Sequence, residues 1–156
     1  MALSMDSDEG ISHVDYQALA ELRYQLRRFL RLSEEVVRAR GLKPQQHQLL
    51  LALKGLPGGR KATIGELAER LQVQHHSAVE LIDRLVERGF VVRARDGTDQ
   101  RKVLITLTPK GENVLQELSL YHRAELRSAG PALIRTLNEL INGTNNTDTS
   151  HTTPSS

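Results

Sequence analysis

The chain has 156 residues, enough for one compact domain, and its 38% hydrophobic but only 3% aromatic content calls for a core of aliphatic side chains. It has no cysteine, which excludes disulfides, thiolate metal sites and cysteine-based redox sensing. The formal net charge is only +2. Without a visible signal peptide or an apolar run long enough to span a membrane, the expected location is the cytoplasm and no membrane partner is expected.

Composition along the chain predicts three regions. Residues 1–13 are polar and aperiodic, which predicts a flexible arm. Residues 143–156 are rich in Thr, Ser and Asn, which predicts a disordered polar tail. The stretch between them, 14–142, carries periodic apolar residues and is predicted to be the folded domain.

The first half of this domain has a helical pattern. From Asp15 to Arg40 apolar residues recur mainly every three or four positions, which predicts a long amphipathic helix that stops at Gly41. Pro44 opens a second helix that ends before Gly55.

Two shorter helices follow, joined by a tight turn. Residues 63–66 (Thr-Ile-Gly-Glu) match a capping box and start a short helix. Residues 72–74 are expected to form a three-residue turn. A second helix then covers His75–Arg88, with Gly89 as its C-terminal stop.

Two β-rich runs, 90–95 and 102–108, flank a polar loop and predict a hairpin. Thr108 and Pro109 then start a long helix that is expected to break at Gly130–Pro131 and to be followed by a short last helix. The fold class is therefore mainly α with a small β hairpin (α+β). Helix, turn, helix and hairpin in this order are typical of a winged helix-turn-helix, here flanked by N- and C-terminal helices.

Several short motifs resemble the MarR family of winged helix-turn-helix transcriptional regulators. They are Gly-Glu-Leu-Ala-Glu-Arg-Leu at 65–71, Ile-Asp-Arg-Leu at 82–85, Glu-Arg-Gly at 87–89, Asp-Gln-Arg at 99–101 and Leu-Thr-Pro-Lys-Gly at 107–111. The resemblance covers about residues 16–141. It implies a homodimer held together by the terminal helices, which presents two recognition helices and two wings to a pseudo-palindromic operator on double-stranded DNA. In this family a repressor is more common than an activator.

The second helix of the motif would enter the major groove, where base edges can be distinguished. Ala78 lies at the centre of its buried face, so the residues at its start and on its opposite side are the candidates for DNA contact. These are Gln74, His75, His76, Ser77, Val79 and Glu80. An ordinary solvated helix face is the alternative. Gln74, Val79 and Glu80 depart from residues common in the family.

The wing contributes a local excess of positive charge. Between residues 88 and 110 there are six basic residues and two acidic ones, a candidate phosphate footprint, although a solvated strand face would also account for it. By resemblance Arg101 enters the minor groove, with Asp99 suited to orient its guanidinium through a bidentate pair. The predicted contacts with the DNA backbone around them are Arg93, Arg95 and Lys102.

The resemblance also suggests a small aromatic or anionic effector that releases DNA. The candidate residues are Arg23, Tyr24, Arg27 and His47, although surface arginines and a packed histidine are the alternative. No cofactor and no metal are expected, because His75 and His76 are adjacent and point about 100° apart. His13, His47 and His122 are distant in sequence and could converge in a dimer.

Two other classes of protein are alternatives to a DNA-binding regulator. An enzyme is not predicted, since there is no Gly-rich phosphate loop, no Cys nucleophile and no paired His and carboxylates. A winged helix used only for protein interaction or dimerisation stays open. Salt separates it from a DNA-binding protein, because phosphate contacts weaken steeply as salt rises.

Overall fold

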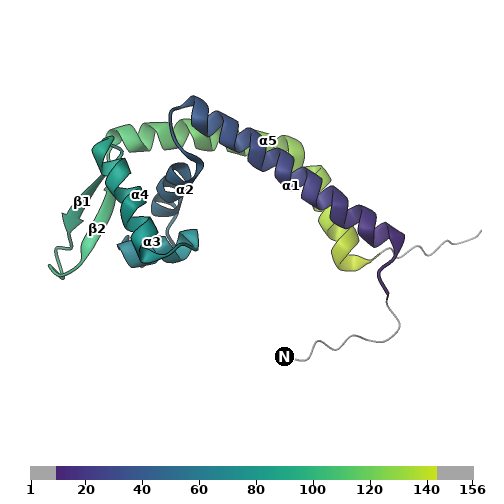
Figure 1. Ribbon diagram of the computed structural model, residues 1–156, viewed down its shortest axis with the longest axis horizontal. Helices are drawn as coiled ribbons and strands as arrows, with labels where there is room; N and C mark the ends of the chain where they lie inside the picture. Colours follow the sequence, from purple (N-terminus) through teal and green to yellow (C-terminus); the bar gives the residue numbers. More distant parts are fainter. Residues whose placement is uncertain (1–9, 144–156) are drawn as a thin grey trace, which may run out of the picture. The chain divides into compact units, whose positions relative to one another are not determined.

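The computed structural model describes residues 10–143, which form five helices and one two-stranded antiparallel sheet (Figure 1). Their order is α1 (His13–Ala39), α2 (Pro44–Lys54), α3 (Ile64–Leu71), α4 (His75–Glu87), β1 (Val91–Arg95), β2 (Val103–Leu107) and α5 (Pro109–Asn142). The predicted mainly α fold with a β hairpin is confirmed. Most of the predicted arm and tail, residues 1–9 and 144–156, lies outside the described residues.

The described chain divides into two compact units. The winged unit comprises residues 31–124 and holds all of α2, α3, α4 and the hairpin. The terminal unit comprises residues 10–30 and 125–143, the outer parts of α1 and α5. The predicted domain, 14–142, extends through both units.

The helix starts follow from local chemistry. Pro44 occupies the first turn of α2, where its missing N–H has no partner to lose. At α3 the Thr63 hydroxyl accepts a hydrogen bond of 3.2 Å from the Glu66 backbone N–H, as the capping box predicts.

The other half of the predicted capping box is wrong. The Glu66 carboxylate pairs with Arg60 at 3.4 Å and Arg70 at 3.3 Å, while the Thr63 N–H donates to the Lys61 carbonyl. Two guanidinium groups outcompete a backbone N–H because they add the attraction between two full opposite charges to the hydrogen bond.

The turn between α3 and α4 is confirmed at residues 72–74. Gln72 adopts a left-handed conformation (φ 55°), and the Val73 N–H donates to the Ala68 carbonyl, which closes α3. The Gln72 side chain donates to the Glu69 carbonyl at 2.8 Å, which helps to offset the cost of this conformation in a residue other than glycine. Gly89 (φ 76°) ends α4 in the same way, as predicted.

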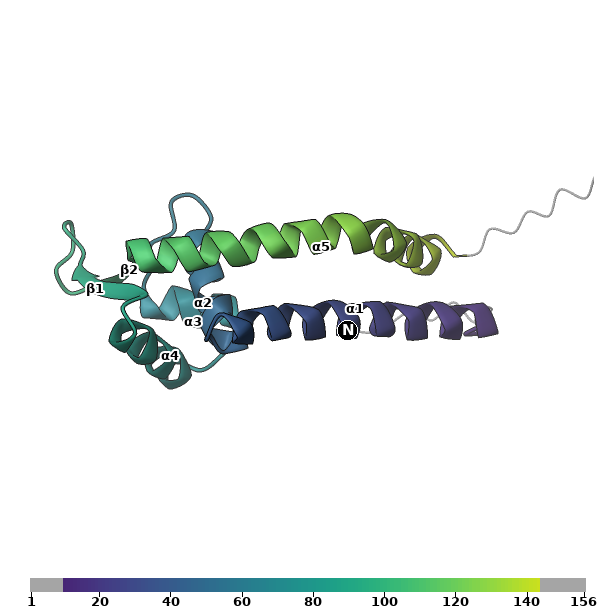
Figure 2. The same cartoon turned by 90° about the horizontal axis from the view of Figure 1, so that it is seen from above.

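The hairpin is an extension of the winged unit's core. Val91 pairs with Leu107 and Ile105 with Arg93 in antiparallel register, and the Ile105 N–H also donates to the Ala62 carbonyl. Gly111 is required beside it, because a Cβ there would lie 2.1 Å from the Phe90 carbonyl oxygen. Figure 2 shows the hairpin extending beyond α3 and α4 of the winged unit.

The core of the winged unit is aliphatic with one aromatic ring, as the composition predicts. Leucines from α2, α3, α4 and α5 meet residues of the hairpin in a single cluster. Its buried members are Val37, Leu42, Leu49, Leu50, Leu67, Ile82, Leu85, Phe90, Val91, Ile105, Leu115 and Leu118. This core fixes α4 against the hairpin.

The predicted break at Gly130–Pro131 is wrong, since α5 is one helix of 34 residues with Pro131 inside it. Proline fixes φ at a helical value and removes one backbone hydrogen bond, so it can bend a helix without ending it. Figure 1 shows the ribbon of α5 changing direction in its last, yellow part.

In the terminal unit a hydrogen bond of 3.2 Å from the Gln25 side chain to the Thr136 hydroxyl joins α1 to α5. Ala18 and Thr136 are buried, but most large apolar side chains of this unit are exposed in the single chain. They are Ile11, Val14, Tyr16, Leu19, Tyr24, Leu26, Leu30, Leu126, Ile134, Leu137 and Ile141.

Candidate nucleic-acid interface

The helix α4 has one buried and one exposed face, as the sequence predicts. Ala78, Ile82 and Leu85 are fully buried against the core. The candidate residues for DNA contact lie at the start of α4 or on its outer side, where Gln74, His75, His76 and Glu80 are exposed and Ser77 and Val79 are half-buried. Because the buried face packs against the core, the six candidate side chains lie together at the start and on the outer side of α4.

Gln74 caps α4 by its backbone position without a hydrogen bond from its side chain. Its amide group is therefore not engaged in holding its own helix. The first N–H groups of a helix also lack partners within the helix and carry partial positive charge. This end of α4 consequently offers donors suited to phosphate or base oxygens.

The turn between β1 and β2, residues 96–102, is called the wing turn, and a buried carboxylate holds it in place. Asp96 is 5% exposed and accepts hydrogen bonds from the Lys61 ammonium and from the backbone and hydroxyl of Thr98. The Lys61 hydrogen bond, followed by those from Thr98, holds the pKa of Asp96 well below its usual range. Sequence reasoning missed Lys61, which lies 35 residues before its partner.

Arg101 is exposed in this turn, which leaves its guanidinium accessible. The predicted bidentate pair with Asp99 does not form. Instead, the Asp99 carboxylate accepts a hydrogen bond of 3.1 Å from the Arg101 backbone N–H. An Asp side chain readily bonds the backbone two residues on, and this contact shapes the turn rather than the guanidinium.

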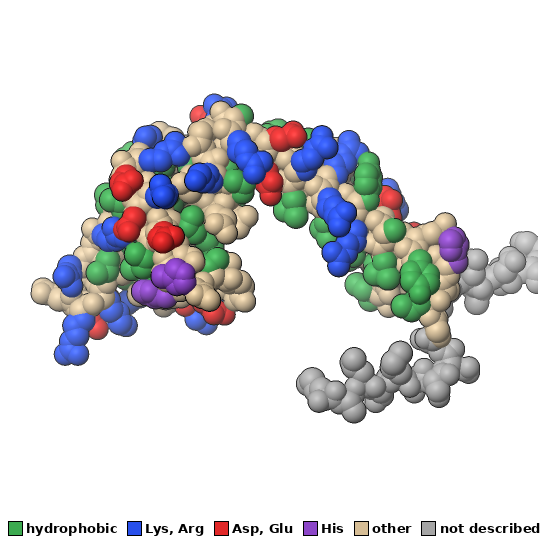
Figure 3. Space-filling model, viewed as in Figure 1, with side chains coloured by type: hydrophobic (Ala, Val, Ile, Leu, Met, Phe, Trp, Pro, Cys, Tyr) green, Lys and Arg blue, Asp and Glu red, His purple; other side chains and the backbone are tan. Residues whose placement is uncertain are grey.

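The other basic wing residues are placed differently from one another. Arg93 faces α4 and forms an ion pair with Asp83, while Arg95 donates to the Gln100 carbonyl at 2.9 Å. Lys102 is exposed next to the turn. Figure 3 shows Lys and Arg side chains at the end of the hairpin and His side chains on the nearby surface of the winged unit.

The predicted effector residues are divided between the two units. Arg23, Tyr24 and Arg27 are exposed on α1 in the terminal unit. His47 is buried in α2 of the winged unit, with its ring centroid 5.0 Å from that of His122. The structure thus describes these residues as two separate groups.

His47 has an unusual environment. Its Nε2 atom is buried without a hydrogen-bond partner, and the His122 Nε2 lies 2.7 Å from the Ser33 hydroxyl. Burial, together with the neighbouring His122, lowers the pKa of His47 to about 4, so its ring is neutral at pH 7. Within residues 10–143, no three metal-ligating side chains come together.

None of the helices in the described part of the chain has the length and apolar character needed to cross a membrane.

A model of the MarR family matches residues 40–102. The HTH-type transcriptional regulator YsmB of Bacillus subtilis is 37% identical over 65 residues, which are 42% of this chain and 44% of that protein. The transcriptional activatory protein BadR of Rhodopseudomonas palustris is 34% identical over 83 residues, 53% of this chain and 47% of its own. The matches therefore span about half the length of these relatives.

Solved structures show the same fold. A MarR family protein from Bacillus stearothermophilus superposes with a TM-score of 0.66 at 23% identity, over 84% of this chain and 96% of that one. A MepR variant of S. aureus bound to an oligodeoxyribonucleotide superposes with a TM-score of 0.61 at 17% identity. The match covers 81% of this chain and 96% of that one. BpsR of Bordetella bronchiseptica, whose DNA binding is regulated by 6-hydroxynicotinic acid, superposes with a TM-score of 0.60 at 22% identity. The match covers 89% of this chain and 100% of that one.

The sequence motifs, the helix-turn-helix with its hairpin and the family match agree, and residues 40–102 form a winged helix-turn-helix domain that matches the MarR family.

Proposed function

We propose that the protein is a sequence-specific DNA-binding transcriptional regulator that acts on double-stranded DNA as a homodimer in the cytoplasm. The observation that carries the proposal is the exposed start of α4 beside a hairpin whose turn presents Arg101. The proposed activity is binding rather than catalysis.

In this proposal α4 enters the major groove. Gln74 and Ser77 carry groups that can bond bases or phosphates, and Val79 can contact a thymine methyl group. Glu80 can accept a hydrogen bond from cytosine N4 but repels phosphates, so it contributes to specificity more than to affinity. His75 and His76 lie beside them at the start of the helix.

The wing reaches the adjacent DNA backbone. Arg101 enters the minor groove, where a narrow groove concentrates negative potential. Asp99 shapes the turn that carries Arg101, while Arg95 and Lys102 lie close to phosphates. Arg93 joins them when its ion pair with Asp83 opens.

The exposed apolar residues of the terminal unit support a homodimer. Monomeric proteins seldom expose large continuous apolar surfaces, and a second copy supplies a matching one through two-fold symmetry. Such a dimer binds a pseudo-palindromic operator whose half-sites are about one helical turn apart.

We further propose that a small aromatic or anionic effector releases the protein from DNA, as the regulation of BpsR by 6-hydroxynicotinic acid suggests. Arg23, Tyr24, Arg27 and His47 remain the proposed effector residues.

The proposed direction of control is repression. BadR is named as an activatory protein, and a reporter gene with and without the regulator distinguishes the two directions.

A salt series tests the proposal directly. If α4 and the wing contact phosphates, the logarithm of the DNA affinity falls linearly with the logarithm of salt, with a slope near −0.9 per phosphate contacted. A winged helix used only for protein interaction shows no such dependence.

Arg101→Ala is the variant for this series, and it is expected to weaken DNA binding by about 1–3 kcal/mol at moderate salt. Arg123→Ala, which removes an exposed arginine of α5 outside the interface, is the matched control and leaves affinity unchanged. Equal affinities of the Arg101→Ala variant and the unmodified protein contradict the assigned role of Arg101.

A further inference from the structure

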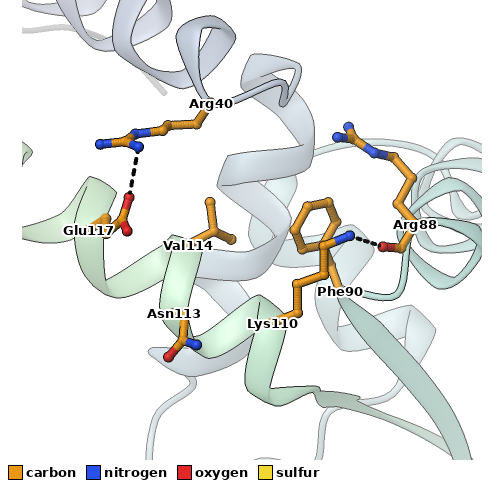
Figure 4. A pocket seen from close by; sticks show the side chains of 7 residues that line it. All are labelled: Arg40, Arg88, Phe90, Lys110, Asn113, Val114 and Glu117. Carbon is orange, nitrogen blue, oxygen red and sulfur yellow. Dashed lines mark hydrogen bonds and ion pairs between the residues drawn. The ribbon is translucent and has the colours of Figure 1, made fainter.

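A basic pocket lies within the winged unit at the end of α4 that is farthest from Gln74 (Figure 4). It has a volume of about 580 Å³, which is in the range of pockets for small organic molecules. Its walls come from the residue after α1, the end of α4, the start of the hairpin and the first turns of α5. The lining residues are Arg40, Arg88, Phe90, Lys110, Asn113, Val114 and Glu117.

Two cations of this pocket are fixed on one aromatic ring. The Arg88 guanidinium carbon lies 5.0 Å and the Lys110 ammonium 4.6 Å from the centre of the Phe90 ring. Arg88 donates to the Gly41 carbonyl at 2.5 Å, and Lys110 donates to the Arg88 carbonyl at 2.7 Å. Both side chains are therefore held in place before any ligand arrives.

The charges in the pocket are not balanced. Glu117 supplies its carboxylate to Arg40 at 3.3 Å. Among the described residues, no carboxylate pairs with Arg88 or Lys110. A guanidinium has five N–H donors and an ammonium three, so each cation keeps donors for a ligand beyond its bond to a backbone carbonyl.

We propose that this pocket binds a small phosphate monoester. A phosphate monoester carries close to two negative charges at pH 7, which matches the two cations without a carboxylate partner. The arginine fork can bind two phosphate oxygens, and the lysine supplies a point charge. The pocket's volume beyond the phosphate accommodates the organic part of the ester.

The pocket is separate from the proposed DNA interface. Gln74 and Arg88 flank the 13 residues of α4, which places them about 20 Å apart along the helix. Phosphates of DNA on the recognition end of α4 therefore do not fill it. The proposal does not depend on the protein's binding DNA.

Isothermal titration calorimetry of the full chain with phenyl phosphate tests the proposal. Inorganic phosphate and phenol serve as comparison ligands, at constant ionic strength. We expect saturable binding of one phenyl phosphate per chain, weaker binding of inorganic phosphate and none of phenol. Absence of saturable binding overturns the proposal, and equal binding of inorganic phosphate overturns the assignment to an ester.

Three variants locate the site. Arg88→Gln is expected to weaken binding about tenfold, or about 1.4 kcal/mol. Glu117→Gln removes the pocket's carboxylate and is expected to tighten binding about threefold, a gain that an unfolded variant cannot produce. Arg101→Ala leaves binding unchanged. Binding that is insensitive to Arg88→Gln and Glu117→Gln, or that is lost in Arg101→Ala, contradicts the assignment to this pocket.

Discussion

His47 illustrates how much of a side chain's chemistry depends on its tertiary surroundings. The helix α2 places the ring in the interior, next to His122, where its Nε2 finds no partner. An imidazolium at this position would be desolvated, which is why the pKa of His47 falls to about 4. The sequence identifies His47 as a candidate for effector binding, but it does not show that His47 is buried next to a second histidine, because that contact forms only in the folded chain.

The stability of the winged unit should therefore depend on pH. Between pH 6.5 and about 4 the unfolded chain binds a proton at His47 that the folded chain does not, so the free energy of unfolding falls as the pH falls through this range. The pKa of His122 is also lowered, and its effect has the same sign. Urea denaturation at pH 7 and pH 5 measures the difference.

His47→Phe should reduce this loss of stability, because a phenyl ring cannot be protonated. His75→Phe, at an exposed position, is the control and keeps the pH dependence of the unmodified protein. An unchanged pH dependence in His47→Phe shows that burial of His47 is not its source.

The wing turn shows what sequence predicts about residues and what it cannot. Arg101 and Asp99 were identifiable from type and spacing, and both lie in the turn between the strands. The partner of each carboxylate was not identifiable, since Asp99 bonds a backbone N–H and Asp96 bonds Lys61. Choice of partner depends on distances within a few ångströms, which only the folded chain sets.

At the scale of elements, α4 and the hairpin are linked by more than the core. The ion pair between Asp83 on α4 and Arg93 on β1 joins the proposed recognition helix to the wing. The two side chains are 50% and 35% exposed, so the pair contributes at most about 1 kcal/mol to stability. Its larger effect concerns charge, because it neutralises an arginine of the proposed interface.

Asp83→Asn should therefore increase DNA affinity. The substitution releases Arg93 and removes a negative charge from the DNA-facing side of α4. If Arg93 then contacts a phosphate, the slope of the log–log salt plot becomes steeper by about 0.9. Fluorescence anisotropy with a labelled duplex measures both quantities, and Glu87→Gln at the far end of α4 is the control. A weaker complex contradicts this role for Asp83.

Element boundaries that depend on local contacts were easier to predict than the continuity of a long helix. Thr63, Gly89 and Pro109 act through backbone geometry or a contact within one turn, and the structure places element boundaries there. The predicted break at Pro131 is wrong because a helix can tolerate the loss of one hydrogen bond when the residues around it favour the helix. The outcome depends on the whole helix rather than on the Gly–Pro pair.

At the scale of the molecule, the terminal unit leaves much of its apolar surface uncovered in a single chain. Its large apolar residues cover little of one another in a single chain, and Ile134 is 59% and Ile141 76% exposed. Burying such side chains contributes about 1.5–3 kcal/mol each, which a second copy of the unit can supply. The periodicity of α1 and α5 predicted apolar faces, but it could not show which faces the chain itself would cover.

Ile134→Asp should disrupt the dimer. A carboxylate in an apolar interface is desolvated without a partner, so the dissociation constant of the dimer rises by at least about tenfold, or 1.4 kcal/mol. Sedimentation equilibrium measures it, and Ser128→Asp, an exposed position about 120° around α5 from Ile134, adds the same charge as a control. An unchanged dimer constant in Ile134→Asp removes this face from the interface.

Selection of bound fragments from a pool of genomic DNA, followed by sequencing, tests the central proposal most directly. The protein should enrich a pseudo-palindromic sequence whose half-sites are about one helical turn apart, and Arg101→Ala should lose that enrichment. Retention of no fragment, even of random duplex at low salt, contradicts DNA binding and favours a module for protein interaction.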